Sequence, residues 1–152
     1  MVYYTKEDLE AISIASFSEE LKGIPYINYS DVLVDLPDSE FVLDTADIFR
    51  QGVCQLFAYA LWEAFGYGVY KIRVGCSFHI FCKSTDRLTY IDVRGKTNDF
   101  YTFISGLDVP TIPNDASEPY AFEDDDFSGE YYDIGLAFAR ALIKRDIERY
   151  GV

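Results

Sequence analysis

The chain has 152 residues, enough for a single domain with a normal buried core. Hydrophobic residues make up 49% of it and aromatic residues 17%, which excludes an intrinsically disordered chain. The net charge of −13 argues against binding nucleic acid or an anionic membrane surface, because both are negatively charged themselves. The same charge keeps a protein soluble, and it would also suit a basic substrate or partner.

Composition also limits location and cofactors. No stretch of the sequence approaches the ~20 apolar residues of a membrane span, and the first residues contain no apolar signal region. No glycine-rich phosphate loop, zinc-ligand cluster or dinucleotide fingerprint occurs. We therefore expect a cytoplasmic protein with no cofactor and no metal, whose oligomeric state the sequence leaves open.

The first segment of the chain predicts a helix. Residues 5–8 resemble a capping box, with Asp8 in place of the usual glutamate. Apolar residues then recur at roughly helical spacing at Leu9, Ile12, Phe17 and Leu21, and Gly23 would end the helix. Residues 24–48 form a lead-in, in which local propensity predicts a short strand at 32–34 and a helical turn after Pro37.

A second helix is predicted to begin at Cys54. Its apolar residues give a broad buried face, at Phe57, Ala58, Leu61, Trp62 and Phe65. The glycines at 66 and 68 supply the C-terminal stop. A cysteine at the first helical position meets the positive end of the helix dipole and free backbone N–H groups, and both favour a thiolate. A cysteine buried as a small apolar side chain is an equally common use of this residue.

Three strands are predicted next, at 69–76, 78–83 and 88–94, with a hairpin turn over 84–87. The only histidine of the chain, His79, falls in the second strand and Asp92 in the third. The two residues are about equally far from the turn, and facing residues of an antiparallel pair lie ~5 Å apart. His79 and Asp92 are therefore predicted to be cross-strand neighbours on one face.

Two strand cysteines need a separate decision. Cys76 and Cys82 fall on adjacent predicted strands, so a disulfide between them stays open. The chain has three cysteines, an odd count. Reduced thiols in a cytoplasmic protein are the simpler interpretation.

The remaining chain predicts two helices and two loops. After a loop over 95–98, Thr97 or Asn98 could cap a short helix through Ile104. Residues 108–130 hold an acidic run at 123–126 and predict a long surface loop, with a calcium site as a weaker alternative. A final helix is predicted over 131–150, with Ile134, Phe138, Leu142 and Ile147 facing the core. Helices, then strands, then helices indicate an α+β fold with a small antiparallel sheet.

Cys54, His79 and Asp92 together form the set of groups that an activated thiol nucleophile needs. Taken singly, His79 is more often a satisfied core histidine, whereas an aspartate inside a strand usually needs a partner. The order and spacing of all three favour a catalytic triad in which His79 is the base and Asp92 orients it.

Three more polar residues are candidates for the same site. Gln51 and Gln55 could polarise a substrate carbonyl beside the Cys54 backbone N–H, although each also fits a surface glutamine, which we favour for Gln55. Arg94 shares the strand face of Asp92, so it could contact substrate. A structural salt bridge between Arg94 and Asp92 is the interpretation we favour.

Residues 50–95, about a third of the chain, resemble the transglutaminase-like branch of the papain-like cysteine enzymes. The likeness is a cysteine at a helix start, a histidine on a strand and an aspartate on the next strand. Arg50-x-Gly52-x-Cys54 is also similar to the Arg-Gly-Gly-x-Cys motif of arylamine N-acetyltransferases, which share that core. Gln51 replaces one glycine of that motif, and Phe81 stands where transglutaminase-like enzymes carry tryptophan.

The resemblance implies a nucleophile helix packed on a small antiparallel sheet, flanked by N- and C-terminal helices, with Cys54, His79 and Asp92 as the triad. It implies a cysteine hydrolase or acyltransferase acting on a peptide, a protein or a small amide or acyl substrate. We expect amide hydrolysis first and acyl transfer or transglutamination second. The alternative is a non-enzymatic acidic interaction or inhibitor protein that binds a basic partner surface.

Overall fold

The computed structural model describes residues 3–22, 45–107, 114–127 and 132–152, without the side chain of Gln51. The described helices are α1 (Lys6–Glu10), α3 (Ile48–Gln51), α4 (Cys54–Phe65), α5 (Phe100–Ser105), α6 (Tyr132–Arg145) and α7 (Ile147–Tyr150), with 3₁₀ turns η1 (Ile14–Phe17) and η2 (Asp124–Phe127). The strands are β1 (Gly68–Val74), β2 (Ser77–Lys83), β3 (Tyr90–Asp92), β4 (Gly95–Thr97) and β5 (Glu118–Pro119). The predicted α+β class with a small antiparallel sheet is confirmed.

The described strands form one antiparallel sheet in the order β4-β3-β2-β1-β5. Side chains of β2 alternate between two apolar clusters on opposite faces of this sheet. Ile80 and Cys82 belong to the large cluster that contains α4, whereas Phe81 packs with Phe103 of α5. His79 points to the same face as Phe81, so the histidine lies on the α5 side of β2.

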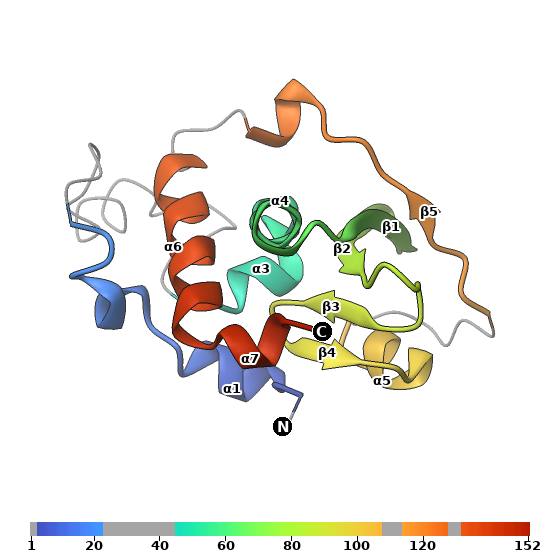
Figure 1. Cartoon of the computed structure of the whole chain (residues 1–152), viewed down its shortest axis with the longest axis horizontal. Helices are drawn as coiled ribbons and strands as arrows, with labels where there is room; N and C mark the ends of the chain where they lie inside the picture. Colours follow the sequence, from blue (N-terminus) through green and yellow to red (C-terminus); the bar gives the residue numbers. More distant parts are fainter. Residues whose placement is uncertain (1–2, 23–44, 108–113, 128–131) are drawn as a thin grey trace.

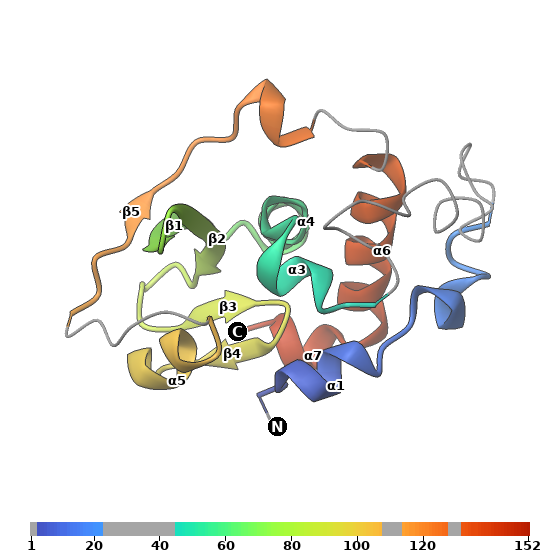
Figure 2. The same cartoon turned by 180° about the vertical axis from the view of Figure 1, so that it is seen from behind.

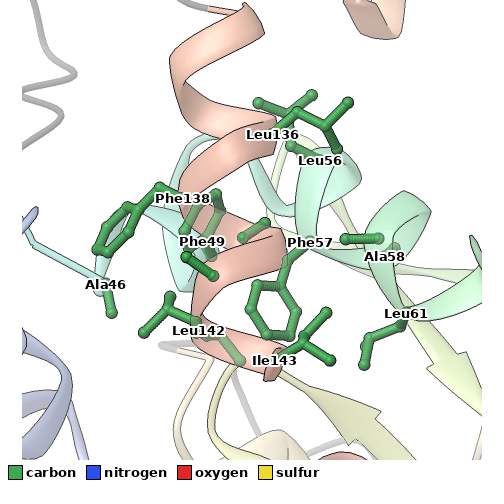
Figure 3. Packing of buried hydrophobic residues seen from close by; sticks show 14 of the residues in the cluster. Ala46, Phe49, Leu56, Phe57, Ala58, Leu61, Leu136, Phe138, Leu142 and Ile143 are labelled. Atoms are coloured by element: carbon green, nitrogen blue, oxygen red, sulfur yellow. The ribbon is translucent and has the colours of Figure 1, made fainter. Parts of the chain in front are cut away.

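Helix α4 lies between α6 and the sheet (Figures 1 and 2). Figure 3 shows Phe49 of α3, Phe57 of α4 and Phe138 of α6 packed together. The ring centroid of Phe49 is 5.4 Å from that of Phe57 and 5.5 Å from that of Phe138. Because α4 is enclosed by apolar contacts on both sides, its first residue is held in a defined place against the sheet.

Residues 114–127 run from the sheet edge at β5 to η2, which lies above α4 in both views (Figures 1 and 2). β5 pairs with β1, and the Tyr59 ring centroid of α4 is 5.4 Å from that of Phe122 and 5.0 Å from that of Phe127. The predicted long surface loop over 108–130 contains two short elements in its described part, β5 and η2, which the sequence analysis did not predict. Short polar segments of this kind carry too little periodicity to be recognised as elements.

The predicted N-terminal helix is divided in two. The capping box is confirmed, because Thr5 Oγ1 accepts from the Asp8 backbone and Asp8 Oδ2 accepts from the Thr5 backbone. The helix ends at Glu10 rather than continuing to Leu21. Ser13 pairs with Thr45 as an isolated bridge and its side chain accepts from Ala15 N, so its backbone is extended instead of helical.

The predicted last helix is also divided, at Asp146, between α6 and α7. Its core residues Ile134, Phe138 and Leu142 are buried as predicted. Ile147 is 50% exposed and Trp62 of α4 is 47% exposed, so the prediction that these two face the core is wrong. Helical spacing alone cannot tell the rim of an apolar face from its centre.

The third predicted strand, over 88–94, is confirmed at a shorter length as β3. A further strand, β4, occupies Gly95–Thr97, so the predicted loop over 95–98 is wrong there. Gly95 has a φ of +120°, which permits the chain reversal between the two strands. Helix α5 is confirmed, but its cap is Asp99, which accepts from Tyr101 N, rather than Thr97 or Asn98. The strand predicted at 32–34 and the turn after Pro37 lie outside the described residues.

The cysteines Cys54, Cys76 and Cys82 are all free, so no disulfide joins Cys76 to Cys82. Within the described ranges, no helix has the length and apolar character needed to cross a bilayer.

Candidate active site

Cys54 is the first residue of α4, as predicted from the sequence. The backbone N–H groups of Gly52 and Val53 both donate to Ile48 O, at 2.8 and 3.1 Å, which closes α3 and lets a new helix start at Cys54. The Cys54 Sγ accepts a hydrogen bond of 3.3 Å from the backbone N of Ile80. The thiol is thus held at the positive end of the helix dipole and against β2.

His79 and Asp92 lie on neighbouring antiparallel strands, with 2.9 Å between His79 Nε2 and Asp92 Oδ2. Cys82 is opposite Ile91 in the register, which places Asp92 across from Phe81 and diagonal to His79. Each of the two side chains is 3% exposed. The expected cross-strand proximity is therefore present as a diagonal contact, because the turn contributes more residues than a symmetric count assumes.

The His79 ring has one occupied and one open nitrogen. The Asp92 carboxylate is ionised, so Nε2 carries the proton and donates it to Oδ2. The buried Nδ1 has no hydrogen-bond partner among the described residues. In the neutral ring this nitrogen is the one that can accept a proton.

The electrostatic surroundings favour the charged form of His79. Burial alone would lower the pKa of His79, but the hydrogen bond to Asp92 and the nearby Cys54 thiol outweigh it and raise this pKa above its ordinary value. Cys54 is close enough to contribute to the shift, although its sulfur does not complete a hydrogen bond with Nδ1. The thiol and the ring are therefore electrostatic neighbours.

Arg94 binds both oxygens of the Asp92 carboxylate. Its Nη2 donates to Asp92 Oδ2 at 2.6 Å, its Nε contacts both carboxylate oxygens, and its backbone N donates to Oδ1 at 2.9 Å. Burial would raise the pKa of Asp92, but the Arg94 charge and the His79 contact hold it well below its usual range. Arg94 is 2% exposed, so the structure places it in a buried ion pair instead of on a surface open to substrate.

Two residues that the sequence analysis missed complete this ion pair. Tyr3 OH donates to Asp92 Oδ1 at 3.4 Å. An added Cβ at Gly106 would lie 2.5 Å from Arg94 Nη1, so the guanidinium needs a glycine at this position. No local sequence signal marks either residue, because both meet Asp92 or Arg94 only through the tertiary fold.

Residues on either side of Cys54 connect the start of α4 to other segments. The Gln51 side chain lies outside the described residues. Gln55 Nε2 donates to Asp126 O at 3.1 Å and so fastens η2 to α4. Arg50 is 5% exposed and donates to Gly106 O at 2.8 Å, which ties the segment before Cys54 to the end of α5.

The acidic run does not build a metal site in the described part of the chain, where no three His, Cys, Asp or Glu side chains are grouped to hold an ion. Asp126 instead accepts from Tyr120 OH at 2.7 Å and from Glu123 N at 2.7 Å.

Comparisons with protein-family models, with curated proteins and with solved structures find no match for this chain.

Proposed function

We propose that this protein is a cysteine enzyme with a papain/transglutaminase-like core, acting on amide or acyl substrates through Cys54, His79 and Asp92. The observation that supports it most is the state of the His79 ring. One nitrogen is fixed on a carboxylate at 2.9 Å, while the other is buried without a described partner and the ring has a helix-start thiol as its electrostatic neighbour. Nucleophile, base and orienting group then occupy the roles of a thiol triad.

In the proposed reaction, His79 Nδ1 takes the Cys54 proton and the thiolate attacks the substrate carbonyl carbon. A sulfur–carbon bond forms while the carbonyl π electrons move to oxygen, beside the N–H groups at the start of α4. The intermediate collapses, the carbon–nitrogen bond breaks, and His79 gives its proton to the leaving amine. Water then adds to the thioester while losing a proton to His79, and Cys54 leaves as a thiolate.

The second half of the reaction decides between hydrolysis and transfer. Water as the second nucleophile gives peptide or amide hydrolysis, which is our first choice. A second amine gives acyl transfer or transglutamination by the same steps, because it also attacks a carbonyl and loses one proton. We propose no cofactor for either path.

Alkylation of the three cysteines at about pH 6, where ordinary thiols are protonated, tests the proposal. Cys76 is exposed and Cys54 is only 6% exposed, so accessibility alone would make Cys76 react first. An activated thiol reverses that order. We expect iodoacetamide to label Cys54 first, as measured by peptide mass spectrometry, and His79→Ala to remove this advantage while Cys76 keeps its rate.

Faster labelling of Cys76 than Cys54, or an unchanged Cys54 rate in His79→Ala, would contradict the enzyme proposal. A folded His79→Ala protein, checked by its melting curve, is needed for this comparison because the ring is buried. Either of these two labelling results would favour the alternative of a non-enzymatic acidic protein, in which the buried His79–Asp92–Arg94 contacts are structural. Such a protein should bind a basic partner with strong salt sensitivity.

A further inference from the structure

Two cations, Lys71 and Arg73, flank an exposed phenylalanine on the β1–β2 hairpin. Lys71 Nζ lies 4.6 Å from the Phe78 ring centroid and Arg73 Cζ lies 5.4 Å from it. Phe78 is 43% exposed. In the described part of the chain, neither Lys71 nor Arg73 makes an ion pair, whereas Lys83, Arg94, Arg140 and Arg145 each do.

The strand register places this group of three residues on the face of β1 and β2 that packs against α4. Lys71 is directly opposite Ile80, and Arg73 is directly opposite Phe78. Residues that face each other across an antiparallel pair project to the same side, as do residues two apart on one strand. Lys71, Arg73 and Phe78 therefore share the face of Ile80, whose backbone N donates to Cys54 Sγ at 3.3 Å.

A second contact joins the same group to the Cys54 surroundings. Lys71 Nζ lies 5.9 Å from the ring centroid of Tyr120, on the segment that crosses to α4. Tyr120 OH is hydrogen-bonded to Asp126, whose backbone oxygen accepts from Gln55, the residue after Cys54. Lys71 is thus connected, through Tyr120 and Asp126, to the start of α4.

Carboxylates lie near the two cations but form no ion pair with them in the part of the chain that the structure describes. The chain carries 26 acidic residues against 13 basic ones, so neutralising carboxylates are plentiful. Glu118 is directly opposite Lys71 but forms no ion pair with it in the described structure, and Asp126 is occupied by Tyr120 and Glu123. Cation–π packing accounts for where the two side chains lie, and neither cation forms an ion pair with a residue in the described ranges.

We propose that Lys71, Arg73 and Phe78 form a binding site for an anionic group of the acyl substrate. Phe78 supplies apolar contact, and the two cations supply attraction for a carboxylate or a similar anion. Substrates would then carry their negative charge close to the carbonyl that Cys54 attacks. This inference rests on the proposed function, because it concerns the substrate of that thiol.

Two alkylating reagents that differ in charge test the site. Iodoacetate and iodoacetamide both place a two-carbon group on sulfur with loss of iodide, but only iodoacetate is an anion. The measured quantity is the ratio of their rates at Cys54, with a melting curve for each protein. In Lys71→Met/Arg73→Met we expect the rate with iodoacetate, divided by the rate with iodoacetamide, to fall about tenfold, because two charges act over several ångströms in a partly hydrated site. The rate with iodoacetamide itself should be unchanged.

The matched control is Lys144→Met/Arg87→Met, which removes one lysine and one arginine that are exposed and lie on α6 and on the β2–β3 turn. Its ratio should stay at the wild-type value. Salt gives an independent check, because the wild-type ratio should fall with ionic strength and the double variant should be insensitive. If the double variant melts early, single Arg73→Gln, at an exposed position, should still lower the ratio.

An unchanged ratio in a folded double variant with a reactive Cys54 would overturn the anionic site and leave the proposed function intact. Equal slowing of both reagents would also overturn it, because the two residues would then act on the thiol and not on the anion. A Cys54 that is unreactive in the wild-type protein would overturn the proposed function and this site together.

Discussion

At the scale of single residues, Asp92 binds both the His79 ring and the Arg94 guanidinium. Its Oδ2 accepts from His79 at 2.9 Å and from Arg94 at 2.6 Å. The carboxylate therefore orients the ring and also neutralises a buried guanidinium. A test of either role has to separate the two.

Asp92→Asn should lower both stability and thiol reactivity. Losing one member of a buried ion pair costs about 3–5 kcal/mol, and each kcal/mol moves the melting temperature of a chain of this size by about 2–4 °C. We expect the melting temperature to fall by roughly 6–20 °C on that basis. The amide also favours the wrong ring tautomer and removes the charge that stabilises imidazolium, so Cys54 alkylation should slow.

The double variant Asp92→Asn/Arg94→Met separates the effect of Asp92 on Cys54 reactivity from its effect on stability. Removing the guanidinium takes away the uncompensated buried charge, so part of the lost stability should return. Reactivity of Cys54 should not return, because the carboxylate facing His79 is still missing. Recovery of both quantities, read from a melting curve and an alkylation rate, would reduce Asp92 to a structural residue.

At the scale of elements, the C-terminal end of α5 controls the position of Arg94. Gly106 is the cap residue of α5, and an added Cβ there would meet Arg94 Nη1 at 2.5 Å. The guanidinium cannot yield easily, because it is bound to Phe103 O and to Asp92. The helix end and the ion pair are therefore packed as one unit.

Gly106→Ala should cost about 1–3 kcal/mol in free energy of unfolding, as for other overpacked sites, and should also slow Cys54 alkylation. Gly66→Ala is the control, because its added Cβ meets nothing within 4 Å and only its φ of +73° is unfavourable. That control should lose about 1 kcal/mol from backbone strain alone and keep its alkylation rate. Urea unfolding curves measure the stability of both variants. A Gly106→Ala protein as stable as wild type would contradict the close packing of Gly106 against Arg94.

At the scale of the whole molecule, stability should pass through a maximum in mild acid. Burial alone would raise the pKa values of Asp92 and Asp115. The Arg94 charge nevertheless lowers the pKa of Asp92, and Lys83 with its neighbours lowers that of Asp115 to about 2. Their stabilisation is present above about pH 4, where unfolded aspartates titrate, and is lost as the pH falls. Burial likewise opposes the raised pKa of His79, whose contribution is present below about pH 6.5 and is lost as the pH rises.

Denaturant midpoints measured from about pH 3 to 8 should therefore peak between about pH 4 and 6.5. The net charge of −13 also lowers stability above about pH 5, because the ionised carboxylates repel one another. Asp115→Asn should make the acid side of the curve shallower and leave the alkaline side unchanged. Stability that rises steadily up to pH 8 would contradict the opposing shifts.

Short-range signals were enough to place helix α4 and the hairpin of β2 and β3. α4 begins at Cys54 and ends at Gly66, whose φ is +73° and whose N–H binds Trp62 O. These features depend on residues within one or two turns of each other, so periodicity and capping residues predict them. The candidate triad followed from the same local reading, because His79 and Asp92 flank one turn.

Features that depend on distant residues were decided only by the tertiary structure. Ser13 leaves the helical conformation because Thr45 pairs with it, and Ile147 is exposed because α7 turns away after Asp146. Tyr3 and Gly106 belong to the site because one reaches Asp92 and the other makes room for Arg94. Neither carries a local pattern, since burial and ion pairing depend on which segments meet in space and not on their order in the chain.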